Sequence, residues 1–256
     1  MRKKKYGLAL GSGGAKGVVH IGCLQAFQEE KISFDITCGS SIGSVIAGMY
    51  ALGYSAREMS LFLKEMDLLN SKWILNAKFK GVYLNNILES VLGERDFSEL
   101  KKPYKAIATD LNSGEEVVIS SGDLCLAMAA SCAIPPAFNP IKIGDRLLID
   151  GAFVNSIPAD ECKKMGADYV LGIDLSADRP MNYTSVNFLN KFYKGHGVKR
   201  CSRSYNGYRY ADLILAPDLS KYTIMGTKNS EKLFEIGYEL VKSNLKTIKE
   251  KLHIIS

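Results

Sequence analysis

Residues 39 to 43 read Gly-Ser-Ser-Ile-Gly, so Gly39 and Gly43 stand two positions before and after Ser41. Glycines at this spacing allow a strand to turn sharply into a helix, because the missing side chains let the two elements come close together. The Ser41 hydroxyl would then project from the turn beside a helix amino terminus, which favours negative charge. The spacing predicts a nucleophile elbow; the competing interpretation is a glycine-rich helix start without chemistry.

A second glycine-rich stretch, Gly-Ser-Gly-Gly-Ala-Lys-Gly at residues 11 to 17, could supply donors for the oxyanion that a serine nucleophile creates. Gly13 and Gly14 can turn their amides into a concave nest that a β-carbon would hinder. A nucleotide-binding loop is the competing interpretation. It is disfavoured because Lys16 stands where the dinucleotide fingerprint needs glycine, no acid ends the following strand, and the sequence contains no Gly-Lys-Ser/Thr.

A serine hydroxyl needs a base to become a good nucleophile, and the chain offers His20, His196 and His253. His20 lies in the helix after the glycine loop, where packing or capping is expected, and His253 lies near the chain end. His196 could follow an acid in the Ser-Asp-His order of an α/β-hydrolase. However, Ser41 follows the second strand, whereas α/β-hydrolases build several strands before the elbow. A carboxylate base is therefore favoured over a histidine.

Asp150 is the best candidate for that carboxylate. It ends the apolar run Arg-Leu-Leu-Ile-Asp and precedes Gly151, which would place it at the carboxyl rim of a sheet, beside the elbow. The alternative is a turn-forming Asp-Gly pair. Asp110, Asp174 and Asp218 also follow strand-like runs, so position alone leaves the choice open.

These groups must be positioned by the secondary structure around them. The chain is expected to begin with a strand, a helix, a second strand and a second helix, which implies a parallel sheet with helices packed against it. These four elements are expected at residues 6–10, 18–30, 34–38 and about 42–52. Two hairpins should follow, one joining strands 104–109 and 116–120 and one within residues 141–150. The remaining expected elements are mostly helical residues 56–100, a helix at 123–131, strands at 169–174 and 212–215, and a last helix at about 230–252 with one apolar stripe.

The composition is that of an ordinary globular chain: 256 residues, 46% hydrophobic, 23% charged, with a formal net charge of +6. This length suits one large domain, or at most two small ones. Six cysteines without a Cys-x-x-Cys pair predict free thiols in a reducing compartment. Neither of the two long stretches with few charges, 37–56 and 124–143, is typical of a membrane span, and the amino terminus lacks the features of a secretory signal. A cytoplasmic protein is expected.

Residues 179 to 211 differ from the rest, because they contain seven Lys or Arg and seven aromatic residues but no Asp or Glu. The pattern has no clear period, so we interpret it as an inserted surface segment. Its charge favours peripheral contact with an anionic membrane surface. A solvated insertion without a partner is the alternative, and nucleic-acid binding is not expected because no reading motif accompanies the charge.

Three motifs, in this order, resemble those of the patatin-like phospholipases, which are acyl hydrolases with a Ser-Asp dyad. They are Gly-Gly-Ala-Lys-Gly at 13–17, Gly-Ser-Ser-Ile-Gly at 39–43 and Asp-Gly-Ala at 150–152. The resemblance extends over roughly residues 6 to 175. It implies a three-layer α/β/α patatin-like sandwich with a mainly parallel central sheet, in a single domain over residues 1–256 that carries the 179–211 insertion.

The resemblance also implies residue roles. Ser41 would be the nucleophile, Asp150 the base, Gly13 and Gly14 the oxyanion donors, and Lys16 would shape the loop. The motifs are completed by Gly11, Gly17, Gly39, Gly43 and Gly151. The substrate would be a fatty acyl ester of a phospholipid or lysophospholipid, with no metal or organic cofactor.

One departure from the family pattern is Ser12, which stands where many members have a third glycine and leaves open which amides form the oxyanion hole. Two alternatives remain. One is an α/β-hydrolase-type esterase that uses His196, and the other is a catalytically silent lipid-binding or membrane-docking module.

Overall fold

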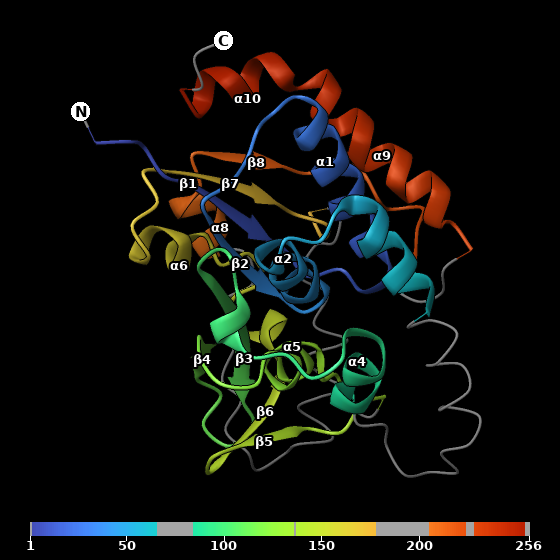
Figure 1. Ribbon diagram of the computed structural model, residues 1–256, viewed down its shortest axis with the longest axis vertical. Coiled ribbons are helices and arrows are strands. Elements are labelled where there is room, and N and C mark those ends of the chain that lie inside the picture. Colours follow the sequence, from blue (N-terminus) through green and yellow to red (C-terminus); the bar gives the residue numbers. More distant parts are fainter. Residues whose placement is uncertain (1, 66–83, 136, 178–204, 224–227, 254–256) are drawn as a thin grey trace.

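The computed structural model describes residues 2–65, 84–135, 137–177, 205–223 and 228–253, which form an eight-stranded sheet flanked by helices (Figure 1). The strands are β1 (Tyr6–Leu10), β2 (Ile36–Ser40), β3 (Tyr104–Asp110), β4 (Glu116–Ile119), β5 (Ile141–Ile143), β6 (Arg146–Asp150), β7 (Tyr169–Ile173) and β8 (Leu213–Leu215). The pairs β1–β2, β1–β7, β2–β3 and β7–β8 are parallel, and β3–β4, β3–β6 and β5–β6 are antiparallel. The predicted mainly parallel sheet is confirmed, with both hairpins in place.

Helices cover both faces of this sheet. The helices are α1 (Val18–Glu29), α2 (Ile42–Leu52), residues 56–65, α4 (Leu84–Leu92), α5 (Leu124–Cys132), α6 (Ala159–Lys164), α8 (Tyr205–Tyr210), α9 (Ser230–Ser243) and α10 (Leu245–Lys251). Successive residues of a strand point to opposite faces. Accordingly, Leu8 and Leu10 of β1 join the larger core under α1, α2, α5 and α9, whereas Ala9 joins a smaller core under α6. The result is three layers.

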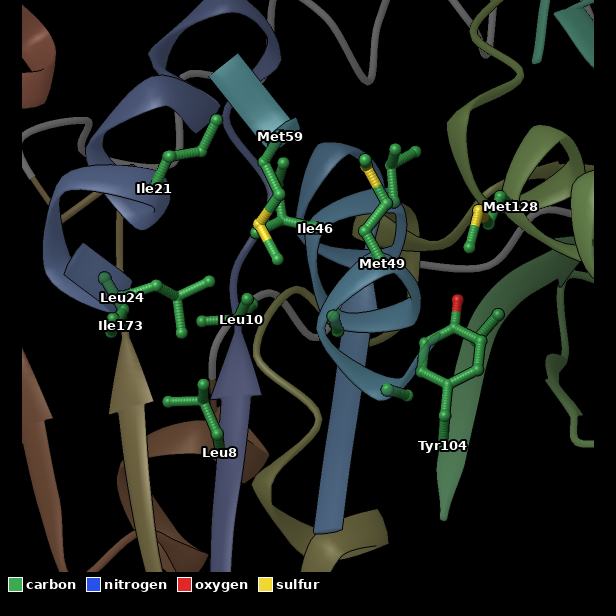
Figure 2. Packing of buried hydrophobic residues seen from close by; sticks show 14 of the residues in the cluster. Leu8, Leu10, Ile21, Leu24, Ile46, Met49, Met59, Tyr104, Met128 and Ile173 are labelled. Atoms are coloured by element: carbon green, nitrogen blue, oxygen red, sulfur yellow. The ribbon is translucent and has the colours of Figure 1, made fainter. Parts of the chain in front are cut away.

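The larger core holds β1, which precedes the glycine loop, and α2, which follows the elbow at Ser41. Figure 2 shows Leu8 and Leu10 in one cluster with Leu24 of α1 and Ile46 of α2. All four side chains are buried. Because truncation of such a side chain typically costs about 2–5 kcal/mol, this packing holds the first and second βα turns rigidly next to each other.

The pairing of β3 explains how two distant parts of the chain meet. β4 pairs with residues Ala106 to Thr109 along one edge of β3. The other edge of β3 is shared by two strands. β2 pairs with its first part and ends at Ser40, which lies opposite Ile107. β6 pairs with its last part and ends at Asp150, which lies opposite Ala108. β2 and β6 therefore run toward each other and end at neighbouring positions of β3. The residues that follow these two strand ends must lie side by side.

The last helix differs from its expectation. Instead of one helix over 230–252, α9 ends at Ser243 and α10 begins at Leu245, with Asn244 between them. The Asn244 side chain donates to the Leu240 carbonyl at 2.8 Å, which competes with the backbone hydrogen bonds of a continuous helix. The apolar stripe survives the break, since Val241, Ile248 and Leu252 are all buried.

Other expectations need smaller corrections or lie outside the described residues. The second strand covers 36–40 rather than 34–38. The Phe34 amide donates to the Tyr50 hydroxyl at 3.0 Å instead of to a neighbouring strand, and the Phe34 ring packs edge-to-face on Phe27, with ring centroids 5.1 Å apart. Residues 66–83 of the expected helical region and 178–204 of the basic insertion are not described. Among the described residues, the structure contains no helix that is both long and apolar enough to cross a membrane.

Candidate active site

Ser41 occupies the predicted sharp turn, between the end of β2 and the start of α2. Its backbone has φ 55° and ψ −134°, a conformation that costs a residue with a side chain about 1–3 kcal/mol. The turn is tight enough that a β-carbon on Gly39 would lie 2.2 Å from the Gly43 carbonyl oxygen, and one on Gly43 would lie 2.2 Å from that of Leu10. The elbow geometry therefore requires both glycines.

Asp150 lies directly beside Ser41, as the end-to-end arrangement of β2 and β6 dictates. The Ser41 hydroxyl donates to Asp150 Oδ2 at 2.6 Å, and the Ala152 amide donates to Oδ1 at 2.8 Å. Asp150 is 0% exposed and Ser41 is 6% exposed. Thr109 donates its hydroxyl to the Asp150 carbonyl at 2.8 Å, which fixes the backbone. Gly151 is needed after Asp150, because a β-carbon there would lie 2.2 Å from the Ile107 carbonyl oxygen.

The other three candidate aspartates, Asp110, Asp174 and Asp218, each accept a hydrogen bond from the backbone amide two residues further along the chain. Asp110 binds the amide of Asn112, and Asp218 binds the amide of Ser220. Asp174 accepts the amide of Ser176 and the hydroxyl of Tyr208. Of the four strand-end aspartates, Asp150 is the one with a hydrogen bond to Ser41.

The glycine loop supplies two amides that are available for an incoming group. The Ser12 amide donates to the Ser156 carbonyl at 3.2 Å, so it is already used. In the described part of the chain, the Gly13 and Gly14 amides donate no hydrogen bond. Gly14 has φ 58°, in the left-handed region that favours glycine. Gly13 and Gly14 are thus the candidate oxyanion donors that remain once Ser12 is accounted for.

The rest of the loop lies against the elbow. A β-carbon on Gly17 would lie 2.2 Å from Ile42 Cγ1, in the first turn of α2. Gly11 is held by its amide, which donates to the Ile173 carbonyl of β7 at 3.0 Å. Lys16 is buried, and its amide donates to the Gly13 carbonyl at 3.2 Å, closing the turn. These contacts place the loop beside the helix that Ser41 begins.

The two described histidines are engaged elsewhere, and His196 lies outside the described residues. The His20 ring lies 2.8 Å from the Gly11 carbonyl through Nε2. Since a carbonyl can only accept, Nε2 carries the proton and donates it to the first residue of the glycine loop. His253 packs on Tyr169, at the opposite end of β7 from the elbow, with ring centroids 4.9 Å apart. His20 is thus buried and hydrogen-bonded to the glycine loop, in a position where packing or capping was expected.

His20 should make stability depend on pH. Burial lowers its pKa from 6.5 to about 4, against the opposing effect of the Gly11 hydrogen bond. Between these values the unfolded chain binds a proton that the folded chain does not. The contribution of neutral His20 to the free energy of unfolding is therefore fully present above pH 6.5, and about 3 kcal/mol of it is lost as the pH drops to 4. His20→Gln keeps a donor for Gly11 but does not titrate.

Urea unfolding of the native protein and the His20→Gln variant, at pH 7 and pH 4, measures this contribution. The variant is expected to lose about 3 kcal/mol less than the native protein between the two pH values, since the remaining titrating groups are shared. Equal losses in the two proteins would contradict the assignment.

Two further residues lie beside the elbow, and the sequence predicted a role for neither. Ser131, near the end of α5, accepts the Ser41 amide through its hydroxyl at 3.0 Å. Cys132 is half-buried as a residue, but its thiol group is buried. That burial and the Asp150 charge raise the pKa of the thiol well above its usual value, while the Ser41 hydroxyl acts in the opposite sense. Because the thiolate is the reactive form, Cys132 is a poor rival to Ser41 as nucleophile. Both lie within the range of the family resemblance, and the tertiary contacts show them beside Ser41.

A group of acidic residues lies near α6. Glu116, Asp160 and Glu161 bring their carboxylate oxygens within 4.8 Å of one another. Lys164 pairs with both Asp160 and Glu161, and Lys105 pairs with Glu161 at 2.8 Å. Lysines thus already occupy the positions that a cation would take, and we interpret the group as an ion-pair network between α6 and β3.

Comparison with known proteins decides the family. Residues 8–163 match the model of the family described as patatin-like phospholipase. The chain belongs to this family. Patatin-like phospholipase domain-containing protein ZK370.4 of Caenorhabditis elegans is 34% identical over 192 residues, which cover 69% of the chain and 14% of that protein. Neuropathy target esterase sws of Drosophila melanogaster is 31% identical over 192 residues, covering 70% of the chain and 13% of that protein.

A solved structure supports the fold. The structure of VipD from Legionella pneumophila matches with a TM-score of 0.61 at 12% identity, over 96% of the chain and 67% of VipD. This match and the family model support the patatin-like sandwich as the fold of the chain. The chain spans only about one seventh of each of the two relatives above, so their activities as whole proteins do not transfer directly.

Proposed function

We propose that this patatin-like chain hydrolyses fatty acyl esters of phospholipids or lysophospholipids, with Ser41 as nucleophile and Asp150 as base. One observation carries the proposal: the Ser41 hydroxyl donates at 2.6 Å to a carboxylate that is completely buried. A buried carboxylate in direct contact with a serine can take its proton without an intervening histidine. The family, and the name esterase in one relative, support an ester as the substrate.

The reaction would proceed through an acyl-enzyme. Ser41 Oγ attacks the ester carbonyl carbon while its proton passes to Asp150 Oδ2. The carbonyl oxygen becomes an oxyanion, for which the Gly13 and Gly14 amides are the proposed donors. Collapse breaks the bond to the lipid alcohol, which leaves with the proton from Asp150. Water then attacks the acyl group, gives its proton to Asp150, and releases the fatty acid as Ser41 recovers its hydrogen.

The competing functions make different demands. A triad esterase would need His196 as base, although Asp150 already contacts Ser41 directly. A silent lipid-binding module would have no use for a strained serine with a buried carboxylate partner. The dyad accounts for both features, and it needs no metal or organic cofactor.

A lipid panel tests the substrate class. The native protein and Ser41→Ala are incubated with vesicles or micelles of phosphatidylcholine, lysophosphatidylcholine and triacylglycerol, and the released fatty acid is measured. The proposal expects release from one or both phospholipids by the native protein and none by the variant. Release from neither phospholipid would remove the substrate assignment, and equal release by both proteins would remove Ser41.

Membrane contact through the basic segment at 179–211 is a separate proposal that rests on its sequence. Each basic side chain near an anionic bilayer contributes about 1 kcal/mol, an attraction that salt screens. We expect the protein to co-sediment with anionic vesicles, less so at higher salt, and least when Lys199, Arg200 and Arg203 are changed to alanine. Equal binding to neutral and anionic vesicles, or no effect of the triple change, would contradict the docking role.

A further inference from the structure

The end of α5 contacts both halves of the candidate dyad through the backbone. The Ser131 hydroxyl accepts the Ser41 amide at 3.0 Å, and the Ala133 carbonyl accepts the Asp150 amide at 2.9 Å. Ser131 and Ala133 are both completely buried. Three consecutive residues therefore bridge two strand ends that are 109 positions apart in the sequence.

The Ser41 backbone needs such support. Its φ of 55° is a conformation that a serine keeps only when its surroundings hold it there. Its carbonyl is held by the Ser44 amide at 2.8 Å, one turn into α2. Its amide has Ser131 as partner, and that partner comes from a different helix. The Ser131 hydroxyl thus fixes the side of the elbow that α2 does not reach.

We propose that Ser131 is a positioning residue, which holds the Ser41 amide so that the Ser41 hydroxyl stays within hydrogen-bonding distance of Asp150. The proposal rests on the proposed function. Ser131 would act through the Ser41 backbone and would touch neither the substrate nor the proton that moves. Its loss should slow formation of the acyl-enzyme without weakening substrate binding, because small displacements of a reacting group lower the rate of the chemical step.

The opposing explanation is that Ser131 only satisfies a buried amide and contributes stability alone. Ser44 provides a matched control, because its buried hydroxyl also lies in the elbow region but pairs with the Tyr104 hydroxyl at 2.6 Å rather than with the Ser41 amide. Ser131→Ala and Ser44→Ala each remove one buried hydroxyl. Only the first removes the partner of the Ser41 amide.

The test measures kcat and KM on a p-nitrophenyl ester and the rate constant for labelling by an alkyl fluorophosphonate, with thermal melts of each protein. Ser131→Ala is expected to lower kcat and the labelling rate constant by about 10- to 100-fold, with KM within about twofold of native. Ser44→Ala is expected to keep both rates within about threefold of native, whatever its melting temperature.

Three results would overturn the positioning role. These are native rates in Ser131→Ala, equal rate losses in the two variants, or a loss confined to KM. If Ser131→Ala does not fold, Ser131→Thr replaces it in the test. Threonine keeps the hydroxyl that accepts the Ser41 amide, so a positioning role predicts that this variant keeps much of the native rate. A folded threonine variant with rates as low as those of Asp150→Asn would exclude the role. A native protein that labels at Ser41 leaves the proposed function intact in all these cases. A native protein that neither labels nor hydrolyses esters ends both proposals.

Discussion

Replacing Ser41 by alanine is expected to lower the rate of ester hydrolysis by on the order of 10³-fold or more, because the attacking atom is removed. The fold should remain, since the turn is set by Gly39 and Gly43 and by the packing of α2 rather than by the hydroxyl. Turnover of a p-nitrophenyl ester and a thermal melt measure the two properties separately. A substantial fraction of native turnover in this variant would show that Ser41 is not the nucleophile.

Ser41→Gly is the matched control for folding. It is equally unable to attack, but glycine adopts φ 55° without the strain that a β-carbon causes. The glycine variant is therefore expected to be inactive and about 1 kcal/mol more stable than the alanine variant. A glycine variant that is less stable than the alanine variant would show that the elbow backbone is not strained.

Asp150→Asn should be nearly inactive, also by about 10³-fold or more, because an amide cannot accept the serine proton. The replacement keeps the size of the side chain and an oxygen for the Ala152 amide, so the fold should persist. His196→Ala should keep most of the activity. Hydrolysis by the two variants, measured side by side on one ester, distinguishes a dyad from a triad. A large loss in His196→Ala together with an active Asp150→Asn would replace the dyad by a triad.

The local parts of the site could be predicted from the sequence. α2 begins and ends where its apolar run and the elbow glycines place it, and the hairpin between β3 and β4 follows from its turn residues. These features depend on neighbours in the chain, where glycine, apolar spacing and turn chemistry act directly.

The parts that depend on distant contacts could not be predicted from local patterns. Four aspartates follow strand-like runs, and the Asp-Gly-Ala motif of the family favoured Asp150. The pairing of β2 and β6 along one edge of β3 explains in physical terms why Asp150 lies beside Ser41. The Ser131 contact has the same origin, since α5 reaches Ser41 across 90 positions of sequence. The break at Asn244 arose from a local competition: the apolar stripe predicted a continuous helix, and a side-chain hydrogen bond to Leu240 interrupted it.

Activation of Ser41 by Asp150 for attack on an electrophile is tested most directly with a long-chain alkyl fluorophosphonate. Ser41 Oγ would displace fluoride and retain the phosphonyl group, which peptide mass spectrometry can locate. We expect one adduct per chain, on the peptide that contains Ser41, with labelling at least about 10³-fold slower in Asp150→Asn. An adduct on another residue, or a native protein that remains unlabelled, would contradict the account.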